Sequence, residues 1–201
     1  MSSTKQLQSG LKQSVQSYGK LILSWQQDVE MVQEILGALT RGQRALDGVR
    51  ASAQRGHLVV FARFPDLQGK LEAALARDLE QKYLLLRQSV HGMGDVITAL
   101  SATANDALQS VLGQDAEGAF PSDAIFTAEH VLEMQSLQSR FALEYQRKQR
   151  LIEYLLLNGH GEADVSSDGI AECSSSWGDS SDDSLLSNDL LRAFLLQNAI
   201  I

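Results

Sequence analysis

The chain has 201 residues, enough for one domain and a tail, and 44% of them are hydrophobic, so a real core can be buried. The net charge of −8 is uneven, because residues 1–159 carry 17 acidic and 16 basic residues while residues 160–201 carry eight acidic residues and one basic residue. Because positive and negative charges nearly cancel over residues 1–159, this part has no excess of basic residues to bind nucleic acid, and direct DNA binding is not expected.

The first 50 residues predict one long amphipathic helix, over residues 5–50, because apolar residues recur along them at heptad spacing. The two rows are Leu11, Tyr18, Trp25, Val32, Leu39 and Leu46, and then Val15, Ile22, Val29 and Leu36. The second row is interrupted at Gln43, where a polar residue takes the next apolar position. A one-sided helix of roughly 65–70 Å needs a partner for its apolar seam, either in this chain or in another. We expect part of this seam to be left over for a partner.

A second helix of matched length is predicted over residues 65–112. Pro65 suits the first helical position, since its φ is fixed and it has no N–H to satisfy. The residues before it, 51–64, contain a short apolar run that has no second strand to pair with, and we interpret them as a connector. Gly92 and Gly94 favour a local bend in the middle of the second helix.

A third helix should follow a loop at residues 113–126, with Thr127 as its N-cap and Asn158-Gly159 as its stop signal. The predicted fold is therefore all-α. Residues 1–159 are expected to form an elongated three-helix antiparallel bundle or coiled coil.

The tail changes composition abruptly after residue 159. Residues 160–184 are rich in Ser, Asp and Gly, which cannot bury enough apolar area, so they are predicted to be a disordered acidic linker. Residues 185–201 predict a short apolar C-terminal helix, which either docks on a partner or folds back on its own bundle. Ser176 and Ser180 each precede an Asp by three positions and are phosphorylation candidates for an acid-directed kinase.

Catalytic and metal-binding patterns are missing from the sequence. The four histidines have no other His or Cys at ligand spacing, and the single cysteine, Cys173, allows no internal disulfide. Neither a Gly-x-Ser-x-Gly elbow nor a kinase signature is present. No signal core and no apolar run long enough for a membrane span occur. We expect a non-catalytic interaction protein without a cofactor, in the cytoplasm, the nucleus or both.

Four short motifs follow one another along the chain. They are Trp25 with Ile35-Leu36, Phe64-Pro65-Asp66-Leu67, Tyr145-Gln146-Arg147-Lys148 with Tyr154-Leu155-Leu156, and Trp177-Gly178-Asp179 before a Leu-rich terminal helix. In this order they resemble the AIRIM family of ribosome maturation factors, also described as casein kinase 2 substrates. The tail before Trp177 looks longer and more acidic than in that family. Trp25 with Leu21-Ile22-Leu23 also resembles the cyclin-dependent-kinase-2-interacting protein, the family's binding partner.

The resemblance implies a non-catalytic adaptor that pairs with a second helical subunit on a hexameric AAA ATPase. That assembly releases and recycles a shuttling factor from cytoplasmic precursors of the large ribosomal subunit, so contact with the pre-ribosome would be indirect. A role with the same ATPase in chromatin or replisome protein turnover is also associated with the family. The heptads alone allow an alternative, a structural coiled-coil protein of a tethering or cytoskeletal assembly.

Both hypotheses need a surface that binds a partner. The candidates are large apolar residues of the heptad rows, the motifs and the tail: Trp25, Val32, Leu39, Phe64, Tyr145, Trp177, Leu191 and Phe194. Trp25 lies on a heptad row, a position more typical of a core residue than of a cofactor platform.

Overall fold

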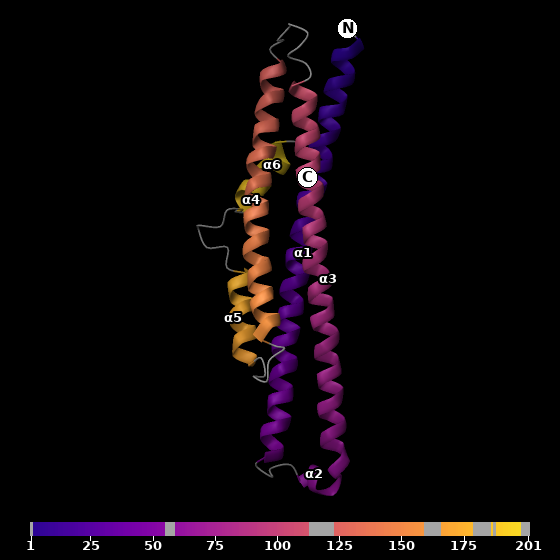
Figure 1. Cartoon of the computed structure of the whole chain (residues 1–201), viewed down its shortest axis with the longest axis vertical. Coiled ribbons are helices and arrows are strands. Elements are labelled where there is room, and N and C mark those ends of the chain that lie inside the picture. The colour runs from indigo at the N-terminus through magenta and orange to yellow at the C-terminus, as the bar shows by residue number, and fades with distance from the viewer. Residues whose placement is uncertain are drawn as a thin grey trace. The chain divides into compact units, whose positions relative to one another are not determined.

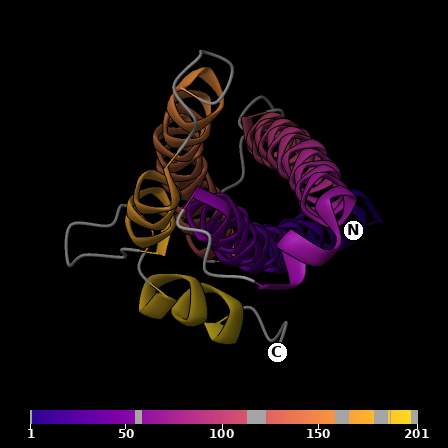
Figure 2. The ribbon, with the colours of Figure 1, turned by 90° about the horizontal axis from the view of Figure 1, so that it is seen from below.

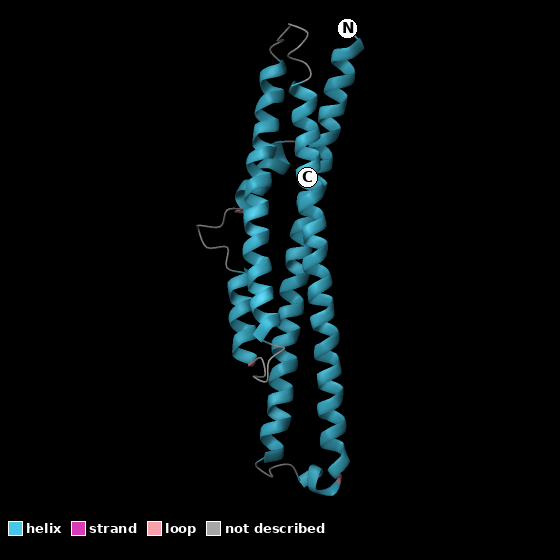
Figure 3. Ribbon diagram, in the orientation of Figure 1, coloured by secondary structure: helices cyan, strands magenta, loops and turns pink. Residues whose placement is uncertain are grey.

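The computed structural model describes residues 2–54, 59–112, 123–158, 166–178, 186 and 188–197. These residues are almost all helical and include no strand, so the all-α prediction is confirmed (Figure 3). The helices, labelled in Figure 1, are α1 (Ser2–Gln54), α2 (Val59–Arg63), α3 (Pro65–Leu112), α4 (Asp123–Asn158), α5 (Ser167–Gly178) and α6 (Asn188–Gln197).

The predicted boundaries are met closely for α3, which spans the expected residues 65–112, and for the end of α4 at Asn158. α1 extends a few residues beyond the expected range at both ends. α4 begins at Asp123, so the prediction of Thr127 as its N-cap is wrong. α2 is a short helix within the expected connector.

The helices contribute to two compact units. Unit 1 contains Met1–Asp28, Gly92–Lys148 and Ser180–Ile201, and unit 2 contains Val29–His91 and Gln149–Asp179. Each unit therefore includes a piece of α1, of α3 and of α4, together with one helix from the tail. This division differs from the predicted one, in which the tail stands apart from a single body.

Unit 1 has an apolar core to which α1, α3, α4 and α6 all contribute. The Tyr18 hydroxyl donates a hydrogen bond to the Met134 carbonyl at 2.9 Å, and its ring meets Phe194 edge-on with centroids 5.7 Å apart. Burial raises the pKa of Tyr18, so its hydroxyl keeps this proton. Phe194 belongs to α6, and the C-terminal helix therefore docks on its own chain, which is one of the two outcomes left open by the sequence.

Close packing at Gly94 explains one of the two mid-helix glycines. A Cβ atom at Gly94 would lie 2.7 Å from the Tyr145 hydroxyl oxygen, whereas one at Gly92 would meet nothing within 4 Å. α3 runs through both positions as continuous helix. Gly94 thus serves the close approach of α4 to α3 within unit 1, a role that the sequence analysis did not foresee.

Unit 2 contains α5, whose existence corrects the disorder prediction for residues 167–178. α5 lies beside α1 and the end of α4 (Figure 2). The Trp177 indole N–H donates to the Val29 carbonyl at 3.2 Å, and the Gln33 amide donates to the carbonyl and hydroxyl of Ser174, both at 3.2 Å. Ile170, Cys173 and Trp177 recur at spacings of three and four residues and are all buried, which offsets the polar composition around them.

The seam of α1 is covered within the chain, contrary to the expected surplus. Its first row is buried at every position from Tyr18 to Leu46. Gln43, where the second row fails, is also buried, and its amide is satisfied by a hydrogen bond of 3.0 Å to the Asp47 carboxylate one turn later.

Candidate interaction surface

Most of the predicted partner-binding residues lie in the core. In unit 1, Trp25 is buried and meets Phe141 and Tyr145 edge-on, with ring centroids 5.5 and 6.4 Å away. Tyr145 is partly exposed, and both Leu191 and Phe194 of α6 are buried. The buried side chains Trp25, Leu191 and Phe194 stabilise unit 1 and are not available to a partner in this arrangement.

The same holds for three of the candidates in unit 2. Val32, Leu39 and Trp177 are buried, with at most 1% of each residue exposed. In the folded chain these three side chains belong to the core and do not form an exposed surface. Heptad spacing shows which side chains are buried, but it does not show whether the covering helix comes from the same chain.

Phe64 is the candidate that the structure leaves exposed, and it has apolar neighbours. It exposes 61% of its surface, and Val60, Leu67 and Leu71 expose 49%, 41% and 38%. We call these four residues the α2–α3 apolar cluster. Single exposed apolar residues are common on protein surfaces, but four large ones lie within twelve residues here, and this density makes the junction a candidate interaction site.

Local backbone geometry holds this cluster at the junction of the two helices. The Phe64 N–H donates to the Val60 carbonyl at 2.9 Å, which closes α2, and the Leu67 N–H donates to the Phe64 carbonyl at 2.9 Å, which opens α3. Pro65 fixes the backbone between them. Leu67 and Leu71 are one turn apart, so they lie on the same face of α3.

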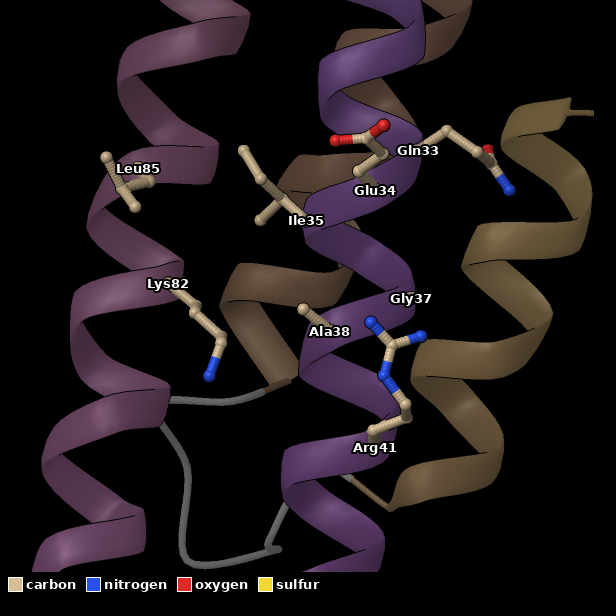
Figure 4. A pocket seen from close by; sticks show the side chains of 8 residues that line it. All are labelled: Gln33, Glu34, Ile35, Gly37, Ala38, Arg41, Lys82 and Leu85. Atoms are coloured by element: carbon tan, nitrogen blue, oxygen red, sulfur yellow. The ribbon is translucent and has the colours of Figure 1, made fainter.

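A second feature of unit 2 is an open groove of about 530 Å³ between α1 and α3. Ile35 and Ala38 on α1 face Leu85 and Lys82 on α3 (Figure 4). Glu34, Gly37 and Arg41 of α1 also line the groove, as does Gln33, whose side chain extends toward α5 (Figure 4). The groove has an apolar floor and charged edges, as protein interfaces often have.

The Tyr-Gln-Arg-Lys motif forms a largely buried ionic cluster in unit 1. The Glu144 carboxylate accepts two bonds from the Arg147 guanidinium, at 2.7 and 2.9 Å, and lies 3.4 Å from the Lys148 ammonium. Burial alone would raise the pKa of Glu144, but the Arg147 hydrogen bonds and the Lys148 charge outweigh it and lower that pKa. Burial lowers the pKa of Lys148 to about 8, although Glu144 opposes the shift. Both basic side chains of the motif are paired with Glu144; Lys148 is buried, whereas Arg147 exposes 41% of its side chain.

The tail contains the two phosphorylation candidates and the single cysteine. Ser176 lies on α5 and is partly exposed, while Ser180 lies outside the described residues. The Cys173 thiol is buried, which raises its pKa to about 11, and its Sγ lies 3.8 Å from the Leu151 carbonyl oxygen. A thiol with this pKa stays protonated at neutral pH and is unreactive.

No protein-family model matches this chain, and no curated protein matches it significantly. Within the described ranges, no helix is long and apolar enough to cross a bilayer. The same residues contain no group of three or more His, Cys, Asp or Glu side chains placed to hold a metal ion.

Two structural features were not predicted from the sequence, although each has a signal there. α5 is marked by the spacing of Ile170, Cys173 and Trp177, which the surrounding Ser and Asp residues conceal. The groove is marked by Glu34 and Arg41, seven residues apart on the polar side of α1, which the apolar heptad rows do not include.

Proposed function

We propose that this protein is a non-catalytic adaptor that binds a helical partner through the α2–α3 apolar cluster. The observation that carries the proposal is the exposure of Phe64 together with three apolar neighbours on one junction. Covering such a patch removes apolar surface from water at roughly 25 cal/mol per Å², which is the main driving force of protein association.

The partner that we propose is a second helical subunit seated on a hexameric AAA ATPase. The assembly would act in maturation of the large ribosomal subunit, by releasing and recycling a shuttling factor. This part rests on the resemblance of the ordered motifs, of which the Phe64-Pro65-Asp66-Leu67 helix start is one of the two most specific. Its first and last residues belong to the exposed cluster, which is what a motif kept for binding would require.

The scaffold proposed for this function is an elongated three-helix antiparallel bundle. Its support is that each unit contains pieces of α1, α3 and α4. We further propose that the protein works in the cytoplasm, the nucleus or both, and that Ser176 and Ser180 are phosphorylated. A helical Ser176 would have to leave α5 before it could fit a kinase, because kinases bind their substrates in extended form.

Capture of partners from cell extract by tagged protein tests the proposal. The test variant is Phe64→Ser with Leu67→Ser, and the matched control is Leu157→Ser, which changes a residue of unit 2 that is 75% exposed and lies outside the cluster. We expect the wild type and the control to recover a AAA ATPase at gentle salt and the double variant to lose it. Both variants should melt like the wild type, because each changes exposed side chains.

Two results would contradict this proposal in different ways. Recovery of no AAA ATPase by the wild type would overturn the proposed partner. Equal recovery by the wild type and the double variant would leave the partner but overturn the assignment of the binding surface to the α2–α3 apolar cluster.

A further inference from the structure

We infer that the exposed face of α1 in unit 2 is a self-complementary interface, which pairs with the same face of a second copy of this chain in antiparallel orientation. The inference uses residues outside the α2–α3 apolar cluster. It is therefore independent of the proposed adaptor function and concerns a different surface.

The face consists of residues at spacings of four and three along α1, which places them on one side of the helix. We call it the charge-segregated face: Glu30, Glu34, Gly37, Arg41 and Arg44. The four charged residues are exposed, and Gly37 is partly exposed. Both acidic residues precede Gly37 and both basic residues follow it.

These charges are not used within the folded chain. In the described parts of the protein, none of the four makes an ion pair or a side-chain hydrogen bond with another residue. The nearby Lys82, by contrast, pairs with Asp78 on its own helix. Four unpaired charges, sorted by sign along one helix face, are what an intermolecular contact would use.

An antiparallel pairing matches this charge order to itself. The midpoint between Glu34 and Arg41 falls between Gly37 and Ala38, and Glu30 and Arg44 lie seven residues on either side of Gly37. A two-fold axis at this midpoint therefore brings the acidic half of one copy opposite the basic half of the other. A parallel pairing would bring like charges together, so the charge order selects the antiparallel one.

The residues at the axis allow the two helices to approach closely. Gly37 and Ala38 have the smallest side chains, and a Cβ atom at Gly37 would meet only the Arg41 guanidinium, at an ordinary 3.5 Å. Close helix contacts elsewhere use small residues at the crossing point in the same way.

A stable contact between two copies also needs apolar area to bury, and the groove supplies it. Exposed ion pairs contribute only about 0.2–1 kcal/mol each, so they set orientation more than affinity. Ile35 and Ala38 form the floor, and Leu85 of α3, 52% exposed, forms one wall. Met31, 46% exposed, lies between the two glutamates on α1. A helix of a second copy laid along α1 would cover these side chains.

The occupant that fits best is a second copy, because the charge order is symmetric about its own midpoint. A different helical protein would need the matching order by coincidence. The pairing is isologous, so it closes at two copies and leaves no face to extend a filament.

Charge exchange between copies tests the inference, with molar mass measured by light scattering after size exclusion at low salt. The first variant is Glu30→Arg with Glu34→Arg, and the second is Arg41→Glu with Arg44→Glu. The third carries all four changes and so keeps the composition and net charge of the wild type. Circular dichroism confirms that each variant remains helical.

We expect the wild type to have twice the chain mass of 22.0 kDa and to dissociate as salt is raised. Each two-residue variant should be a monomer, and an equimolar mixture of the two should form dimers. The four-residue variant should dimerise like the wild type, because its charge order is reversed but still self-complementary. A monomeric wild type at high concentration would overturn the inference, as would dimers of either two-residue variant.

Discussion

The attachment of α5 to unit 2 depends on Trp177, which makes this residue a direct test of how the tail folds. The side chain is 1% exposed and its indole N–H donates to the Val29 carbonyl at 3.2 Å. Replacing a buried aromatic side chain with Ala typically costs about 3–5 kcal/mol, from lost apolar burial and from the cavity left behind. We expect Trp177→Ala to lower the free energy of unfolding by this amount.

The hydrogen bond can be separated from the burial. Trp177→Phe keeps an aromatic ring in the site but removes the N–H donor, which is worth about 0.5–1.5 kcal/mol for a typical hydrogen bond. The smaller ring leaves some of the site empty, so we expect a loss between that value and the loss for Ala. Leu157→Ala, at a position that is 75% exposed, is the matched control and should change stability by less than about 0.5 kcal/mol.

Urea unfolding followed by circular dichroism measures these differences. In a Trp25→Phe background, Trp177 is the remaining tryptophan, so its fluorescence reports the environment of α5 alone. Hydrogen exchange of the amides of residues 167–178 should show protection that Trp177→Ala removes. A loss below about 1 kcal/mol, with unprotected amides in the wild type, would show that the packing of α5 on unit 2 has been assigned incorrectly.

Two further predictions concern unit 1. Gly94→Ala places a Cβ atom 2.7 Å from the Tyr145 hydroxyl and should lower the free energy of unfolding by about 1–3 kcal/mol. Gly92→Ala meets nothing within 4 Å and should raise it by about 0.5–1 kcal/mol. Thermal melting distinguishes the two variants. Burial lowers the pKa of Lys148 from 10.5 to about 8, so the unfolded chain binds this proton more tightly. The free energy of unfolding should therefore rise as pH increases from about 8 to about 10, and Lys148 should contribute no pH dependence well below pH 8, where both states hold the proton. Lys148→Met should flatten this rise, and an unchanged slope would contradict the assignment.

The sequence predicted the long helices well because their rules are local. The heptad rows through Tyr18 and Leu36 identify α1, and Pro65 marks the start of α3. α5 was missed because composition and spacing disagree there: Ser and Asp residues outnumber the apolar ones, yet Ile170 and Trp177 are enough to bury one face. Tertiary contacts with Val29 and Gln33 decide the outcome, and no local rule contains them.

The candidate surface was predicted only at Phe64. The apolar pattern identifies residues that avoid water, but the choice between a core and an interface depends on how many covering helices the chain itself provides. The chain itself covers these residues: Trp25 meets Phe141 and Tyr145 of α4, and both Trp25 and Val32 are buried, so they are core residues and not interface residues.

Site-specific cross-linking from the α2–α3 apolar cluster tests directly whether this surface binds a AAA ATPase assembly. A photoreactive phenylalanine analogue is placed at Phe64, and at Leu157 as a control, and cross-linked proteins are identified by mass spectrometry after irradiation in cells. We predict that position 64 cross-links to a subunit of a AAA ATPase assembly and that position 157 does not. Cross-linking of that assembly from position 157 but not from position 64 would contradict the claim, as would its absence from both.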